Sequence, residues 1–262
     1  MPQNDLATSP RQTLPVLGAP IDVVTAAQAV QRIKIWADAG QSRVVCICNA
    51  HSVVTTTTDM PFCAAVATAD MATPDGAAVA WMLRKLGARQ QQRVCGPDLM
   101  LDYCAQAAQH GDAIYLYGST QATLDALQKQ LLARWPSLRI AGAESPPFRA
   151  LTQSEDDAAV ARINASGAGT VWVSLGCPKQ ELWMAAHHGR IHAVMVGVGA
   201  AFDFHAGTIT RAPLWMREHG LEWLHRLASE PRRLWRRYLV TNSIFMLRAA
   251  RQLLLRSVNA RS

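Results

Sequence analysis

The stretch TVWVSLGCPKQELWMAAHHGRIHAVMVGVG, residues 170–199, places two apolar runs on either side of an amphipathic segment. Residues 170–176 and 192–199 are predicted strands, and residues 179–187 between them are a predicted helix. Both strands are apolar throughout, which is typical of a sheet that is covered on both faces. The stretch therefore predicts a strand, helix, strand unit in a largely parallel sheet.

The same alternation extends back to residue 16 of the chain. The further predicted strands are 43–50, 112–118 and 138–143, and the further predicted helices are 25–38, 76–86, 98–109, 120–134 and 153–165. This pattern indicates an α/β fold with a mostly parallel sheet and helices on both faces. Ligands of such sheets bind at the carboxyl ends of the strands, so we expect the functional residues in the loops there.

Composition and charge divide the chain into a core and a basic tail. The 262 residues are 50% hydrophobic and 17% charged, which favours one globular domain with an extension over extensive disorder. Residues 211–262 contain eleven arginines, no lysine and three glutamates, whereas residues 1–210 are nearly neutral. Such a tail should bind anions, which could be nucleic acid, lipid phosphates or an anionic substrate.

In the tail, leucines and aromatic residues recur at helical spacing among the arginines. This pattern predicts two helices, separated by a break at Pro231. Its longest uncharged run, Tyr238 to Leu247, is ten residues long, well short of the roughly 20 that a membrane span needs. We therefore expect at most a peripheral membrane contact. The first 18 residues lack the basic start and apolar run of a secretory signal, so we expect a cytoplasmic protein with six reduced cysteines.

Three predicted strand ends carry glycine or polar residues of the kind that bind a phosphate or diphosphate. Each of these junctions is a weak signal by itself. The candidates are Asn49 and His51 after the strand at 43–50; Gly176, Pro178, Lys179 and Gln180 after the strand at 170–176; and Gly197, Gly199 and Asp203 after the last strand. Arg93 and Lys179 are the cationic candidates of the core.

Several common nucleotide and metal motifs are missing from the sequence. Phe202 stands where the third glycine of a dinucleotide fingerprint would fall, and neither a P-loop nor a GxSxG elbow occurs. There is no DxD triplet to hold a diphosphate through a metal, and His188 with His192 is a weak zinc candidate. We expect no metal site and no cofactor, so that cationic side chains and helix ends would neutralise any bound diphosphate.

Asp75 and Asp98 each lie at a predicted helix start, in TPDGAAV and GPDLMLDY. An aspartate at such a position commonly accepts backbone N–H bonds and meets the positive end of the helix dipole. Spacing alone therefore favours capping for both residues, with a catalytic carboxylate as the alternative.

The motifs TPDGAAVAW, RVCGPDLM, LYGST, VSLGCPKQELW, GVGAAFDFHAGTITRAPLWM and GLEWLHRLASEPRRLWRRYL occur in this order. Together they closely resemble the WecG/TagA/CpsF family of bacterial glycosyltransferases, over residues 14 to about 239. The resemblance implies a Rossmann-like α/β core and an inverting, metal-independent enzyme. It also implies transfer of a sugar from a UDP-sugar to a polyprenyl diphosphate-linked saccharide at the cytoplasmic membrane face. The donor sugar stays open among N-acetylmannosamine, its uronic acid, glucose and glucuronate.

The resemblance assigns roles to residues of this sequence. Asp75 of the TPDG motif, which also contains Thr73, corresponds to the proposed general base. Asn49, Arg93 and Gln180 match substrate-site positions, and Asp98 lies in the family's G-x-D-L-M motif. Ile47 stands where many members have threonine, and His51 is the candidate to replace the lost hydrogen bond. The candidates for binding diphosphate or membrane are Arg211, Arg226, Arg232, Arg233, Arg236 and Arg237.

The domain prediction is therefore a flexible tail at residues 1–13, a glycosyltransferase core at 14–210 and a helical appendage at 211–262. The appendage is expected to contact the membrane and close the active site, and its apolar residues also allow self-association. Two other classes stay open: a nucleic-acid-binding protein acting through the basic tail, and a non-catalytic α/β scaffold. The tryptophans among the leucines of the tail favour a membrane interface over nucleic acid.

Overall fold

The computed structural model describes residues 11–259, except for the side chains of Arg233, Arg237 and Asn259. Its centre is a parallel sheet of six strands in the order β4, β3, β8, β7, β5, β6. The strands are β3 (Arg43–Cys48), β4 (Met71–Pro74), β5 (Ala113–Gly118), β6 (Arg139–Glu144), β7 (Thr170–Ser174) and β8 (Val194–Gly197). The prediction of a mostly parallel α/β sheet is confirmed, and the five predicted strands are all present.

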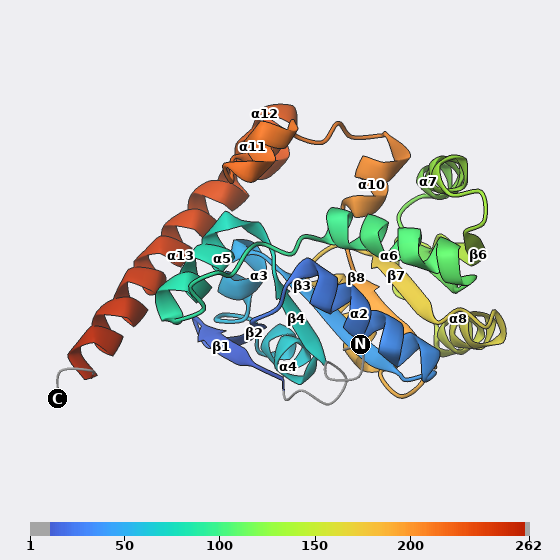
Figure 1. The fold of residues 1–262 in the computed structure, drawn as a ribbon, viewed down its shortest axis with the longest axis horizontal. Coiled ribbons are helices and arrows are strands. Elements are labelled where there is room, and N and C mark those ends of the chain that lie inside the picture. The colour runs from blue at the N-terminus through green and yellow to red at the C-terminus, as the bar shows by residue number, and fades with distance from the viewer. Residues whose placement is uncertain (1–10, 260–262) are drawn as a thin grey trace.

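Helices cover both faces of this sheet, so every strand except the edge strand β6 is almost entirely buried. One face packs against α2 (Ala26–Asp38), α6 (Gly96–His110), α7 (Gln121–Arg134) and α10 (Ala201–Ala206). The other packs against α3 (Ala50–Thr55), α4 (Met60–Thr68), α5 (Gly76–Leu86), α8 (Gln153–Ala165), α9 (Lys179–His187) and part of α13 (Pro231–Asn259). Figure 1 shows these layers around the sheet. The six core helices predicted from the sequence are confirmed.

Several short elements were not predicted. They are the antiparallel hairpin of β1 (Thr13–Val16) and β2 (Ala19–Asp22), the edge strand β4, and the short helices α3, α4, α10 and α11 (Leu214–Glu218). A strand of four residues is too short to show a period, and all three of these strands contain proline. The strand β4 matters most, because its pairing with β3 brings Asp75 to the same edge of the sheet as Asn49.

The predicted break at Pro231 is confirmed. Helix α12 (Glu222–Ser229) ends just before it, and α13 begins with the proline, where the missing N–H costs no hydrogen bond. Figure 1 shows α13 as the long red helix beside α3 and α5. Phe245 and Ala249 of α13 are buried in the core, and Gln252 donates to Pro15 O and accepts from Leu17 N in the hairpin. No helix within residues 11–259 has both the length and the apolar character to cross a membrane.

Candidate active site

A cavity of about 810 Å³ opens at the carboxyl ends of the central strands. Its floor is formed by the loops that follow β3, β4, β7 and β8, which contribute Asn49, Asp75, Gly176 and Gly199. Residues of α12 and α13 form the opposite wall. The position agrees with the expectation that ligands bind at this edge of a parallel α/β sheet.

Asp75 directly follows β4, and its backbone N–H donates to Cys48 O at the end of β3 (2.9 Å). The next residue, Gly76, has a φ of +79°, a conformation that side chains with a Cβ rarely adopt. Asp75 occupies the N-cap position of α5, but its side chain does not make the usual capping hydrogen bond, which comes from the second or third N–H group of the helix. The interpretation as a side-chain cap is therefore wrong in this structure, and the carboxylate lines the cavity instead.

The environment of Asp75 raises the pKa of its carboxyl group from 3.8 to about 6. Burial is the main cause, and the negative charge of Glu222 adds to it. Arg93, the Gly76 N–H and Arg211 lower the pKa, but their effect is smaller. A carboxylate in this pKa range is suited to accept a proton near neutral pH.

Asn49 and His51 lie on the wall formed by the end of β3. The Asn49 Oδ1 caps α3 by accepting from the backbone N–H groups of His51 and Ser52 (3.0 and 3.2 Å). This leaves the Asn49 side-chain NH₂ as the group suited to donate toward the cavity. His51 Nδ1 lies 3.4 Å from Thr241 Oγ1 of α13, so the ring contacts the appendage, and Ile47 lines the same cavity.

Gln180 and Glu181 form a buried polar pair in the first turn of α9 and line the cavity. Gln180 Nε2 donates to Glu181 Oε1 (3.0 Å). Gln180 Oε1 has no hydrogen-bond partner among the described residues, and it lies 3.6 Å from where a Cβ on Gly199 would stand. That distance is an ordinary contact, whereas a Cβ on Gly197 would lie 3.1 Å from Gln180 Nε2 and would crowd this amide. Glu181 was not among the predicted site residues, although it follows Gln180 in the same motif.

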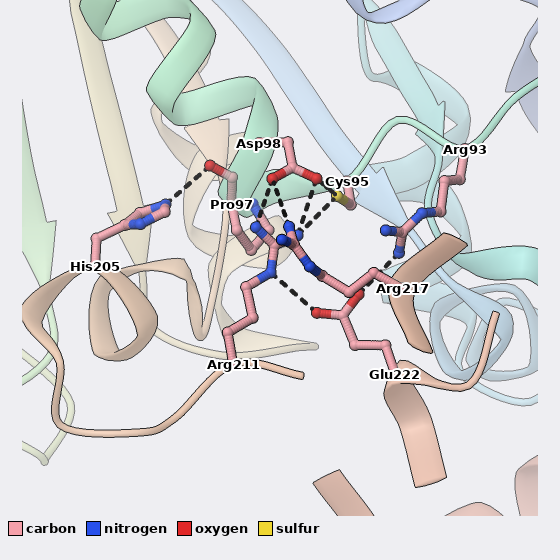
Figure 2. A network of polar contacts seen from close by, with 8 residues as sticks. All are labelled: Arg93, Cys95, Pro97, Asp98, His205, Arg211, Arg217 and Glu222. Atoms are coloured by element: carbon pink, nitrogen blue, oxygen red, sulfur yellow. Dashed lines mark hydrogen bonds and ion pairs between the residues drawn. The ribbon is translucent and has the colours of Figure 1, made fainter. Parts of the chain in front are cut away.

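Residues 211–230, which contain α11 and α12, form what we call the lid segment, because ion pairs hold it against the mouth of the cavity. Arg93 of the core donates to Glu222 Oε2 (2.8 Å), and Arg211 donates from Nε to Glu222 Oε1 (3.1 Å). Figure 2 shows Glu222 between these two guanidinium groups. Glu222 was not among the predicted site residues.

Asp98 fixes the other side of Arg211. Arg211 Nη2 donates to Asp98 Oδ2 (2.9 Å), the Cys95 thiol donates to the same oxygen (2.9 Å), and Arg217 lies 3.6 Å from Oδ1 (Figure 2). Burial by itself raises the pKa of Asp98, but the hydrogen bonds from Arg211 and Cys95 outweigh it and lower the pKa from 3.8 to about 2. Asp98 lies in the first turn of α6, where its charge meets the positive end of the helix dipole as expected, but the N-cap is Cys95, so the prediction of a side-chain cap is wrong here too.

Arg226 extends from α12 over the ring of Phe204, with 5.4 Å between the guanidinium carbon and the ring centroid. Both residues line the cavity. The Arg226 Nε is buried and has no hydrogen-bond partner among the described residues. The cavity mouth therefore combines a stacking surface with a guanidinium group that can still bind an anion.

The predicted site residues fall into three groups. Those that line the cavity are Asn49, His51, Asp75, Arg93, Gly176, Gln180, Gly197, Gly199, Asp203 and Arg226. Thr73, Asp98 and Arg211 lie just behind the wall, where Thr73 Oγ1 donates to Val94 O (3.2 Å). Pro178, Lys179, Arg232 and Arg236 are not among the described residues that line it, and the side chains of Arg233 and Arg237 lie outside the described residues.

Residues that the sequence reasoning missed come mainly from the lid segment and α13. Besides Glu222, the cavity is lined by Trp223, Tyr238, Thr241 and Phe245. Only their helical pattern is visible in the sequence, and that pattern is the same for a helix packed elsewhere. Among the described residues, no group of three or more His, Cys, Asp or Glu side chains is arranged to hold a metal ion.

Comparison with known protein families gives a match to the model of the glycosyl transferase WecG/TagA/CpsF family, over residues 14–259. The match includes Asp75, the strand-end loops, the lid segment and α13. It covers nearly the whole 262-residue chain and agrees with the resemblance drawn from the sequence motifs. The chain therefore belongs to the WecG/TagA/CpsF family of glycosyl transferases.

Proposed function

We propose that this protein transfers a sugar from a UDP-sugar to a polyprenyl diphosphate-linked saccharide, as an inverting enzyme of cell-surface polysaccharide synthesis. The family supports a glycosyltransferase role in that synthesis. The observation that supports the finer proposal best is the Asp75 carboxylate, which has a pKa of about 6 and shares a cavity with Arg93 and Arg226. This arrangement combines a proton acceptor with cations for a leaving diphosphate.

In the proposed reaction, an acceptor hydroxyl attacks the anomeric carbon of the donor sugar. The bond from that carbon to the diphosphate oxygen breaks on the opposite face, and UDP leaves with the bonding electrons. Asp75 accepts the proton of the attacking hydroxyl. A base of this kind contributes roughly 10²- to 10⁴-fold in rate.

Arg93, Arg211 and Arg226 are the proposed partners of the diphosphate. Guanidinium groups bind phosphate oxygens in a bidentate manner and keep their charge at all relevant pH values. In this proposal they stabilise the growing negative charge, so the reaction should proceed without an added divalent cation. Activity that is unchanged in EDTA would support this part of the proposal, whereas a requirement for Mg²⁺ would contradict it.

We propose that the appendage binds the cytoplasmic membrane face, where a polyprenyl acceptor is located. Trp215, Trp223, Trp235, Leu239 and Leu247 of the appendage are all more than 40% exposed. Exposed arginines, Arg232 and Arg236 among them, lie on α13, which also carries Trp235, Leu239 and Leu247. A helix with exposed aromatic and leucine side chains and many arginines is typical of binding to an anionic membrane surface.

Vesicle flotation tests the membrane proposal. The double variant Trp235→Ala, Leu239→Ala should bind less to vesicles that contain anionic lipid. Phe148→Ala is the matched control, because Phe148 is 85% exposed on a loop of the core. Equal flotation of the wild type and the double variant would contradict the proposal. A change in the sedimentation of the double variant would instead indicate that these residues join two copies of the chain.

The reaction itself is tested with a panel of UDP-sugars and polyprenyl diphosphate-linked acceptors. Release of UDP should require both the correct sugar and an acceptor. UDP release without acceptor dependence would indicate a hydrolase. If no pair gave UDP release and the protein bound DNA or RNA in a salt-sensitive way, the nucleic-acid alternative would be favoured.

A further inference from the structure

Glu222 accepts hydrogen bonds from two guanidinium groups: that of Arg93, which lines the cavity, and that of Arg211, which lies just behind its wall. One of its oxygens accepts from Arg93 and the other from Arg211, at 2.8 and 3.1 Å (Figure 2). The three side chains are only 15 to 22% exposed, so the contact is partly shielded from water. Glu222 is therefore a specific partner of both arginines.

A carboxylate that bridges two arginines presents an anionic oxygen to each guanidinium group, as the phosphate oxygens of a diphosphate would. Arginine binds carboxylates and phosphates with the same planar set of N–H donors. A diphosphate that accepted from Arg93 Nη1 and Arg211 Nε would take the place of the Glu222 oxygens. The two anions therefore compete for the same donors.

The charges of the site make this competition stronger. Asp75 and Glu222 both line the cavity, and the charge of Glu222 contributes to the raised pKa of Asp75. Arg211 also donates hydrogen bonds to Asp98. A bound diphosphate beside Glu222 and Asp75 would thus meet two carboxylates, and removing Glu222 relieves that repulsion.

The helix that carries Glu222 is weakly held, whereas its neighbour is firmly packed. Helices α11 and α12 contain no buried residue. Helix α13 buries Phe245 and Ala249 in the core. Glu222 is the first residue of α12, two positions after Gly220 with a φ of +71°. Glu222 can therefore leave the arginines without disturbing the core.

We propose that Glu222 is a built-in competitor for the diphosphate site: it neutralises Arg93 and Arg211 in the empty enzyme and is displaced when a diphosphate ligand binds. Displacement couples ligand binding to a new position of the lid segment. The inference rests on the proposed function for the identity of that ligand, a nucleoside diphosphate or its sugar ester.

The test is isothermal titration of pyrophosphate and, separately, of UDP into the wild type and into Glu222→Gln. The glutamine keeps the shape of the side chain but removes its charge, so both probes should bind about tenfold more tightly, which is within the usual range of coupling between sites. Glu218→Gln is the matched control: Glu218 is an exposed residue of α11, and its loss changes the net charge equally. The control should bind both probes as the wild type does.

Equal or weaker binding of both probes to Glu222→Gln would overturn the inference, because Glu222 would then position the arginines and not compete for them. Equal tightening in Glu218→Gln would overturn it as well, since net charge would explain the gain. If pyrophosphate bound more tightly to Glu222→Gln but UDP bound to no variant, the competition would stand and the proposed donor would be wrong. If neither probe bound to any variant, both proposals would fail.

Discussion

Asp98 on α6 accepts two hydrogen bonds from Arg211, the first arginine of the lid segment, at 2.5 and 2.9 Å. This ion pair connects the core, beside Cys95, to the lid segment. The two helices of the lid segment, α11 and α12, contain no buried residue. The lid segment therefore depends on ion pairs more than on packing. Its position should respond to changes in those pairs while the core stays intact.

Asp98→Asn should loosen the lid segment. Asp98 is 40% exposed, so we expect the pair to contribute about 1 kcal/mol, which corresponds to a roughly fivefold larger equilibrium constant for opening. Hydrogen exchange of the amides in residues 211–230 measures this change. Asp102→Asn, on the exposed side of the same helix, is the control and should leave the exchange unchanged. Equal exchange in Asp98→Asn and the wild type would show that other contacts hold the lid segment.

Asp75→Asn should lower the rate of transfer by roughly 10²- to 10⁴-fold, because the amide cannot accept the proton of the acceptor hydroxyl. The wild-type kcat/KM should be level above about pH 6 and fall about tenfold per pH unit below it, since the pKa of Asp75 is about 6. The variant should still bind UDP. A transfer rate close to that of the wild type would make Asp75 a structural residue.

Asp75→Asn should also change how stability depends on pH. Because the pKa of Asp75 is raised in the folded protein, ionisation costs more there than in the unfolded chain. Above about pH 6 the full cost of ionising Asp75 lowers the stability of the folded wild type. This loss of stability decreases as pH falls from 6 toward 3.8. The variant should therefore be more stable than the wild type at pH 7.5, with a smaller difference at pH 5.

Urea unfolding at the two pH values measures the effect, with the exposed Asp125→Asn of α7 as the control. A stability difference that was the same at both pH values would contradict the assigned pKa direction.

The fold could be predicted from the sequence largely because its strands are buried on both faces. Apolar runs such as 170–176 and 192–199 have the length of a buried strand, whereas a buried helix is usually longer. The edge strand β4 could not be predicted in this way, since four residues with a proline show no period. Without β4, the sequence does not show that Asp75 and Asn49 are close, because Asp75 follows β4, Asn49 follows β3, and these two strands pair in parallel.

The site was predictable where it lies in strand-end motifs and not where it depends on distant contacts. Local rules favoured capping for Asp75 and Asp98, whereas the structure directs both side chains elsewhere. Glu222 meets Arg93 across 129 positions of sequence, and no local pattern marks that contact. The net charge of the tail likewise predicts a free basic segment, whereas Arg211 is paired with Asp98 and Glu222 in the structure.

Gly220→Ala should displace the lid segment. A Cβ at this position would lie 2.5 Å from the Ala77 Cβ of α5, and φ is already +71°. Gly189→Ala is the matched control, because Gly189 has a φ of +81° with open space around it. Both variants carry the backbone cost of roughly 1 kcal/mol. Only Gly220→Ala should also increase hydrogen exchange in residues 211–230. Equal exchange in the two variants would show that the contact with Ala77 is unimportant.

Phe245→Ala tests whether α13 is part of the core or a removable appendage. Phe245 is 1% exposed and packs in the same core as residues of α3 and α5, so its truncation should cost about 3 to 5 kcal/mol of unfolding free energy. Leu247→Ala, on the same helix but 74% exposed, should cost about 0.5 kcal/mol or less. Urea unfolding distinguishes the two.

If both substitutions had the same small effect, α13 would be only loosely docked and deletion of residues 211–262 would be a clean test of closure. If Phe245→Ala destabilises as expected, that deletion also removes core packing. Loss of transfer in a truncated protein would then not separate closure from folding, and Glu222→Gln and Gly220→Ala are the variants that test the lid segment with α13 left in place.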